Sequence, residues 1–144
     1  MTILLDARTS QNASLVNSIS IPVLLNATPG LFGQIGLNVQ TATGPIRVQL
    51  SGTATIQLPL LPAATTITIR VVRGTTLADP LIFSCAQSLD LSILGPQIFT
   101  FTASDFNVPQ PVSGPLVYTA FISSNVLGAF RVGPESFNGI AYSD

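Results

Sequence analysis

The sequence predicts an all-β fold, with antiparallel strands packed as a sandwich. Three features of the sequence predict it. Apolar residues recur with a period of two, β-branched residues fill the periodic stretches, and Gly, Pro, Asn and Asp separate one stretch from the next. No amphipathic helix is expected between these stretches, which excludes parallel strands joined by helices. A chain of 144 residues is long enough for one such domain.

The clearest strand is expected at residues 46–60, where seven apolar residues share one parity: Ile46, Val48, Leu50, Ala54, Ile56, Leu58 and Leu60. Their neighbours are mostly Arg, Gln, Ser and Thr, so one face is buried and the other is not. The segment is either one strand or two strands bent at Ser51-Gly52. Residues 65–74 repeat the pattern. Further strands are expected at 18–26, 33–41, 80–87, 97–104, 116–124 and 136–143, and 88–93 is a candidate for another short one.

The number and spacing of these strands favour a jelly roll of about eight strands. An immunoglobulin-type domain usually has a core Trp and two Cys, whereas this chain has no Trp and a single Cys, Cys85. Because Cys85 lies in a predicted strand, we expect it to pack as a small apolar residue. Gly33 and Gly36, also in a predicted strand, are expected to mark a bulge or a close approach of another backbone. The domain is predicted to span 18–144, preceded by an extended arm at 1–17.

The composition excludes several classes of function. Charged residues make up 8% of the chain, the net charge is −1, and there is no Lys or His. Nucleic-acid binding needs many cations to neutralise phosphates, so we expect none. Without His and with one Cys, a zinc site is not expected, and the usual general base of an enzyme is missing. We therefore expect no enzyme activity and no cofactor. No apolar run is long enough for a membrane span, and no signal peptide is recognisable.

The acidic residues offer no clear catalytic pair. Asp90 and Asp105 are the nearest candidates, but Asp in such positions usually caps turns or faces solvent, which is what we expect here. Asp105-Phe106-Asn107 alternates oxygen ligands as calcium loops do, yet the Gly and distal Glu of an EF-hand loop are absent. We expect no metal site.

The order of the predicted strands from 18 to 144 resembles the jelly-roll heads of the tumour-necrosis-factor and complement-type family. The segments that carry the resemblance are TITIRVVRGTTLADPLIFS, QIFTFTASDFNVPQPVSGPLVYTAFISS and the final FNGIAYS. It is closest to bacterial versions, at the tips of collagen-like exosporium proteins and in endospore appendage subunits. The chain departs from them in having no collagen-like tract and no paired N-terminal cysteines. The resemblance implies a non-enzymatic protein that forms trimers or filaments outside the cell or on the spore surface.

Two groups of residues are candidates for contacts between subunits. The first lies on strand faces and comprises Phe99, Phe101, Val117 and Phe121, because several strands are apolar on both parities and a solitary sandwich should show more polar outer faces. For Phe99 and Phe101 the alternative is ordinary core packing. The second group is the short apolar leader, Ile3, Leu4 and Leu5, with Asp6 and Arg8 behind it.

The leader has two interpretations. It adds a strand to a sheet edge of a neighbouring subunit, which would build filaments, or it pairs back onto its own domain. The sequence thus predicts a structural subunit that assembles with copies of itself into a fibre or layer on the spore surface or outside the cell, with other surface-layer proteins as further candidate partners. The alternatives are a trimeric recognition head for a carbohydrate or receptor, and a viral capsid or fibre protein.

Overall fold

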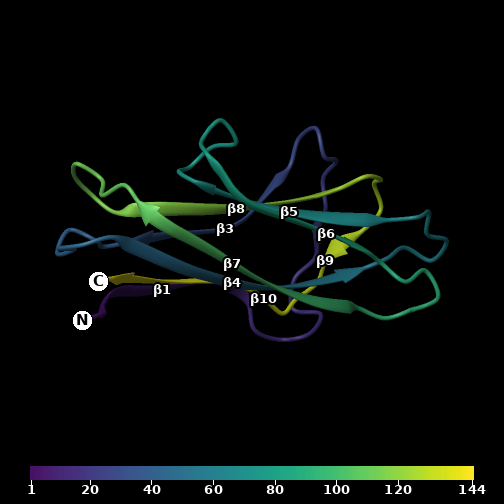
Figure 1. The fold of residues 1–144 in the computed structure, drawn as a ribbon. Coiled ribbons are helices and arrows are strands. Elements are labelled where there is room, and N and C mark those ends of the chain that lie inside the picture. Colours follow the sequence, from purple (N-terminus) through teal and green to yellow (C-terminus); the bar gives the residue numbers. More distant parts are fainter.

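A computed structural model describes all of residues 1–144 and contains strands but no helix. The strands lie in two antiparallel sheets packed face to face (Figure 1). They are β1 (Ile3–Ala13), β2 (Ile21–Pro22), β3 (Gly30–Leu37), β4 (Ile46–Gln57), β5 (Thr66–Arg73), β6 (Leu81–Ser88), β7 (Gln97–Val108), β8 (Leu116–Ser124), β9 (Phe130–Arg131) and β10 (Glu135–Ser143).

The first sheet has the order β1-β10-β4-β7, and the second has the order β3-β8-β5-β6. The short β9 pairs with the end of β4 beyond β10, and β2 pairs with β9. Along the chain, β1, β4, β7 and β10 belong to the first sheet, whereas β3, β5, β6 and β8 belong to the second. This repeated crossing between sheets is a jelly roll, and the predicted fold class is confirmed.

The period-two pattern is what builds the core. The inward residues Ile46, Val48 and Leu50 of β4 are each at most 2% exposed, and they meet the inward residues of the second sheet. β4 is one continuous strand, so the alternative of a break at Ser51-Gly52 is wrong. Gly52 lies opposite Phe101 of β7, whose ring occupies the space where a side chain at position 52 would stand.

The other predicted strands agree with the structure to different degrees. Most of them correspond to one strand each, but 18–26 contributes only the short β2, and 88–93 forms a loop in which Leu89 alone is buried. The register shifts between Leu31 and Gly33, which is the expected bulge, and a Cβ at Gly33 would stand 2.8 Å from Cβ of Phe137.

Residues 3–13, expected to form part of an extended arm, pair along β10 as an edge strand. The segment therefore adopts the second of its two interpretations in this structure, pairing with its own domain. Bulges interrupt β1 between Leu4 and Asp6 and between Gln11 and Ala13. Leu5 packs against the core, and Asp6 accepts hydrogen bonds from the main-chain N–H of Asn38 (2.8 Å) and from Arg8 (2.9 Å). These contacts explain how a segment with two charges lies along a sheet edge.

Two ion pairs, one partly buried and one fully buried, join different strands of the sandwich. Arg73 of β5 donates two hydrogen bonds of 2.8 Å to Asp105 of β7, and Tyr118 of β8 donates a third, 2.7 Å long. The expectation that Asp105 caps a turn or faces solvent is wrong, because its side chain is only 9% exposed. At the opposite end, Arg131 pairs with Glu135, and both side chains are at most 5% exposed.

The two ends of the sandwich differ in composition. Both chain termini lie at one end (Figure 1), together with the pairs Arg47–Asp144 and Arg73–Asp105. The other end, called here the apolar end, consists of the segments 14–29, 58–65, 89–96 and 125–134, which are loops apart from the short β2 and β9. Its only charged residues are Asp90 and the buried Arg131. No helix of the structure could cross a membrane.

Candidate self-association surface

The candidate site is the outer face of the first sheet. Alternate residues of its four strands point away from the core, and the pairing registers align them in rows across β1, β10, β4 and β7. From one end to the other, these rows are Leu4, Tyr142, Arg47 and Phe106; Ala7, Ile140, Gln49 and Ser104; Thr9, Asn138, Ser51 and Thr102; and Gln11, Ser136, Thr53 and Thr100. Arg47 is the only charged residue in these rows.

The polar side chains in the middle of this face have no hydrogen-bond partner within the chain. Gln49, Ser51, Thr102, Ser104 and Asn138 make no hydrogen bond to another side chain or to the main chain, and all are at least partly exposed. Each therefore keeps its donors and acceptors available for an external partner.

On the outer face of the second sheet, several polar side chains form hydrogen bonds within the chain, and only Thr68 and Ser84 form none. Gln34 donates to Thr119 (2.9 Å), which in turn donates to the carbonyl oxygen of Gly74 (2.7 Å). Thr66 and Ser88 share a hydrogen bond of 3.1 Å across β5 and β6. The first sheet therefore carries the larger group of outer polar side chains without hydrogen-bond partners within the chain.

A shallow depression of about 390 Å³ lies in the middle of the outer face of the first sheet. It is lined by residues of the three strands β10, β4 and β7: Gln49, Leu50, Ser51, Thr102, Ala103, Ser104, Asn138, Gly139 and Ile140. The depression exists because the central side chains are short. It leaves room for a side chain from another molecule.

The row of Leu4, Tyr142, Arg47 and Phe106 borders the polar middle of the face. Phe106 is 76% exposed and Leu4 is 62% exposed. Between them, the guanidinium carbon of Arg47 lies 5.9 Å from the centre of the Tyr142 ring, and its Nη2 is 3.0 Å from Oδ1 of Asp144. Stacking and pairing of Arg47 neutralise its charge locally. The row therefore offers two exposed apolar groups beside an aromatic ring.

The strand-face residues predicted to contact other subunits fall into two sets. Phe101 is 6% exposed within the core, and Phe99 is half-buried against it, which agrees with the alternative of core packing for these two residues. The Phe101 ring lies among Phe32, Phe83 and Phe137.

Val117 and Phe121 point outward from β8, half-buried, on the outer face of the second sheet. For the leader, Leu4 is the residue that joins the outer face of the first sheet, whereas Leu5 faces the core. The outer polar residues were visible in the sequence only as the polar parity of 46–60. Which other strands flank them depends on pairings that no local pattern specifies.

Asp79 and Asp90 both bind groups of their own turns. Asp79 accepts main-chain N–H bonds from Thr75 and Thr76 (both 2.8 Å), and these bonds lower the pKa of its carboxyl group. Asp90 accepts hydrogen bonds from the hydroxyl and N–H of Ser92, with the same effect on its pKa. Both are turn caps, as expected for Asp90. No group of three or more acidic, His or Cys side chains could hold a metal ion.

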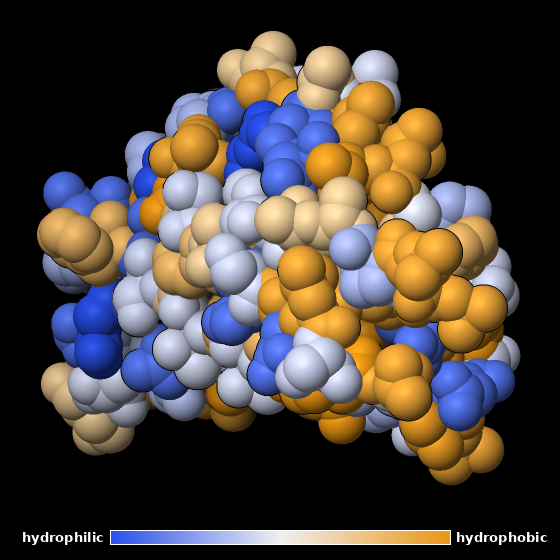
Figure 2. Space-filling view, turned by 90° about the vertical axis from the view of Figure 1, so that its right-hand side faces the viewer, coloured by the Kyte–Doolittle hydropathy of each residue, from blue (hydrophilic) through white to orange (hydrophobic).

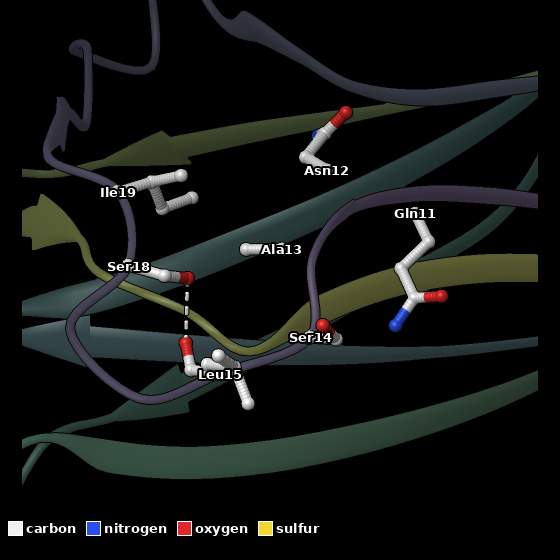
Figure 3. Close-up of a pocket in the computed structure, with 7 residues that line it drawn as sticks. All are labelled: Gln11, Asn12, Ala13, Ser14, Leu15, Ser18 and Ile19. Carbon is white, nitrogen blue, oxygen red and sulfur yellow. Dashed lines mark hydrogen bonds between the residues drawn. The ribbon is translucent and has the colours of Figure 1, made fainter.

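A second hollow, of about 340 Å³, lies beneath the loop that follows β1 (Figure 3). Gln11, Ser14 and Ser18 are among its lining residues, and Ser18 donates a hydrogen bond of 2.6 Å to the carbonyl oxygen of Leu15. Asn12 turns its amide to the carbonyl of Phe32 and the carboxylate of Glu135. No charged residue lines this hollow.

No family model and no curated protein matches the chain. Among solved structures, a chain of a T13 particle of IBDV is similar, with 8% identity and a TM-score of 0.51, over 95% of this chain and 35% of that one. The structure of infectious bursal disease virus strain Gt gives 10% identity and a TM-score of 0.51, over 95% and 37%. Eiger TNF from S. frugiperda shares 13% identity over 94% and 92%, with a TM-score of 0.45.

The chain thus spans little more than a third of the two viral chains. At these identities the similarity concerns the fold alone, and that fold is the predicted jelly roll. The spore-surface part of the sequence resemblance stays a prediction.

Proposed function

We propose that this protein is a non-catalytic structural subunit that associates with copies of itself through the outer face of the first sheet. The observation that carries the proposal is a face of four strands whose central polar side chains are unengaged and whose only charged group, Arg47, is already paired with Asp144. The face replaces the N-terminal leader as the main contact, since that leader pairs with β10.

The physical argument rests on what buried interfaces tolerate. The core of an interface is depleted in charge and enriched in aromatic residues, and its polar groups must find partners. Ser51, Thr102 and Asn138 supply short hydrogen-bonding groups, while Tyr142 and Phe106 supply aromatic area. Short side chains also let two sheets approach closely. With charged residues at 8% of the chain, little charge repulsion opposes association.

The assembly is proposed to be a fibre or layer outside the cell or on the spore surface. Composition supports this: the chain has no Lys, and of its five Arg the buried Arg131 and the paired Arg73 are poorly accessible. Trypsin-like proteases cleave after Lys and Arg, so few sites remain. A closed shell is the rival assembly, since the viral chains of similar fold come from particles.

The test is the mass of the assembly in solution. Light scattering coupled to size exclusion should give a multimer for the intact chain and a monomer for Ser51→Arg, because an unpaired guanidinium would be buried in the interface. The matched control is Thr68→Arg, which places the same charge on the outer face of the second sheet. It should leave the multimer intact.

A monomeric intact chain at all accessible concentrations would sink the proposal, as would dissociation by Thr68→Arg but not by Ser51→Arg. Negative-stain electron microscopy of the multimer then separates a fibre or layer from a closed shell or a discrete trimer. Circular dichroism of both variants verifies that each one is folded.

A further inference from the structure

The apolar end of the sandwich has no role in the proposed association. Figure 2 looks directly at this end and shows apolar residues gathered over much of its surface, more densely on one side. The most exposed of them come from four separate loops: Leu15 (69% exposed), Val16 (62%), Leu60 (91%), Leu61 (94%), Leu94 (84%) and Leu127 (66%). A typical monomer exposes large apolar side chains singly, so a group of this size marks a binding surface.

These side chains protrude. A leucine that is more than four-fifths exposed stands clear of its neighbours, and Leu60, Leu61 and Leu94 all do so. A rigid partner could bury them only in matching hollows. The hollow beside this end is the one beneath Leu15, and it is lined mainly by polar residues such as Gln11 and Ser18. A second copy of the chain therefore offers no apolar socket there, whereas lipid chains adapt to any shape.

The loop 58–65 is suited to an apolar medium. Pro59 and Pro62 flank Leu60 and Leu61, and proline has no N–H group that would lose a hydrogen bond to water. The prolines also restrict the loop before binding, so less conformational entropy is lost. An ordinary exposed turn is rich in polar side chains, whereas residues 58–64 of this loop are only Leu, Pro and Ala.

Few charged groups lie at this end. Asp90 is the one exposed charged residue of the four segments, and its carboxylate accepts hydrogen bonds from Ser92. The half-buried Arg70 of β5 reaches the segment 14–29, where its guanidinium donates to the carbonyl oxygen of Asn26 (3.3 Å). Attraction to acidic lipids needs several free Lys or Arg side chains near the surface, whereas Arg70 is a single and already bonded one. Both termini lie at the opposite end (Figure 1), so the apolar loops can meet a surface without obstruction by the rest of the chain.

We propose that the apolar end docks onto a lipid surface, with Leu60 and Leu61 inserted among the lipid chains and no requirement for acidic headgroups. The docking is peripheral, because only loop tips enter the lipid. It is independent of the association through the first sheet.

The experiment is flotation of the full chain with vesicles of phosphatidylcholine alone. The intact chain should float with the vesicles, and added salt should not release it. Leu60→Ser/Leu61→Ser should lower the bound fraction at least tenfold, roughly what the loss of two inserted leucines implies. The matched control, Leu77→Ser/Val112→Ser, removes two exposed apolar residues at the opposite end (43% and 102% exposed) and should float as the intact chain does.

Four results would overturn the proposal. The first three are no flotation of the intact chain, flotation only when phosphatidylserine is added, and equal flotation of the Leu60→Ser/Leu61→Ser variant. The fourth is a lower mass of that variant than of the intact chain in light scattering without vesicles, which would assign the leucines to a contact with a second copy of the chain. The Ser51→Arg variant should still float, so that failure of the lipid proposal and failure of the self-association proposal are separable.

Discussion

Arg73 and Asp105 join the two sheets of the sandwich through a bidentate ion pair. Nε and Nη2 of Arg73 each lie 2.8 Å from a carboxylate oxygen of Asp105, and the Tyr118 hydroxyl donates to the same carboxylate. The strands involved, β5, β7 and β8, come from both sheets. The cluster thus holds the charged end of the sandwich closed.

Asp105→Ala should lower the free energy of unfolding by about 3–5 kcal/mol, because it leaves the partly buried guanidinium and the buried hydroxyl without their acceptor. Urea unfolding followed by circular dichroism measures this. Asp144→Ala removes the acceptor of an exposed pair, with side chains 45% and 49% exposed, and should cost clearly less. Equal effects of the two substitutions would contradict the structural role of Asp105.

The same cluster predicts a loss of stability in alkali. Burial, together with the hydrogen bond to Asp105, raises the pKa of Tyr118 above its usual value of 10.0. The folded protein therefore keeps this proton when the unfolded chain loses it, and the stability from this group falls as pH rises above about 10. Tyr118→Phe should flatten the decline of unfolding free energy between roughly pH 9 and 11. An unchanged decline in the Tyr118→Phe variant would contradict the assignment.

Gly52 is required by the ring of Phe101. A Cβ at position 52 would overlap that ring, so Gly52→Ala should lower the free energy of unfolding by about 1–3 kcal/mol. Adding Phe101→Leu should not increase the cost by its own full amount, because the clash is then relieved. Gly95→Ala, with no atom within 4 Å of its Cβ, serves as control in the same thermal unfolding series. Full additivity of the first two substitutions would argue against the contact.

The thiol of Cys85 is predicted to react slowly with disulfide reagents. Burial raises the pKa of its side chain, which lowers the fraction of reactive thiolate. Modification by a disulfide reagent near neutral pH should be several-fold slower in the folded protein than in urea, as followed by absorbance. A rate that is the same in both conditions would show that the thiol is freely accessible.

The predictable parts of the fold are the strands whose apolar and polar residues alternate along the sequence. In β4, alternate residues such as Ile46 and Val48 are buried as their pattern predicts, and Gln49 lies outside. A strand is expected at 88–93 because Leu89 and Leu91 alternate with polar residues. The segment is a loop after β6, and only Leu89 is buried in it. The ion pair of Arg73 with Asp105 joins residues 32 positions apart, so no local sequence pattern predicts it.

The self-association surface was predictable only in part for the same reason. The polar parity of 46–60 shows that one face of that strand is solvent-facing or shared. The sequence does not state that β7 and β10 flank it, since those pairings join β4 to residues more than 40 positions away. Phe99 and Phe101 share the inward parity of β7, and the Phe101 ring packs in the core against Phe32, Phe83 and Phe137.

Removal of residues 1–12 distinguishes an edge strand from a free arm. In the structure this segment pairs along β10, buries part of Leu5 and brings the Asn12 amide to within 2.7 Å of the buried Glu135 carboxylate. Its loss should lower the free energy of unfolding by roughly 3 kcal/mol or more, from the lost apolar burial and the lost bond to a charged group. Thermal and urea unfolding of the shortened chain measure this, and light scattering follows its mass. A free arm would leave the unfolding free energy unchanged while the multimer falls apart. Shortening by Met1 and Thr2 alone leaves β1 intact and should change stability only slightly, so a large effect of that smaller deletion would shift the explanation to the Thr2–Asp144 contact at the chain ends.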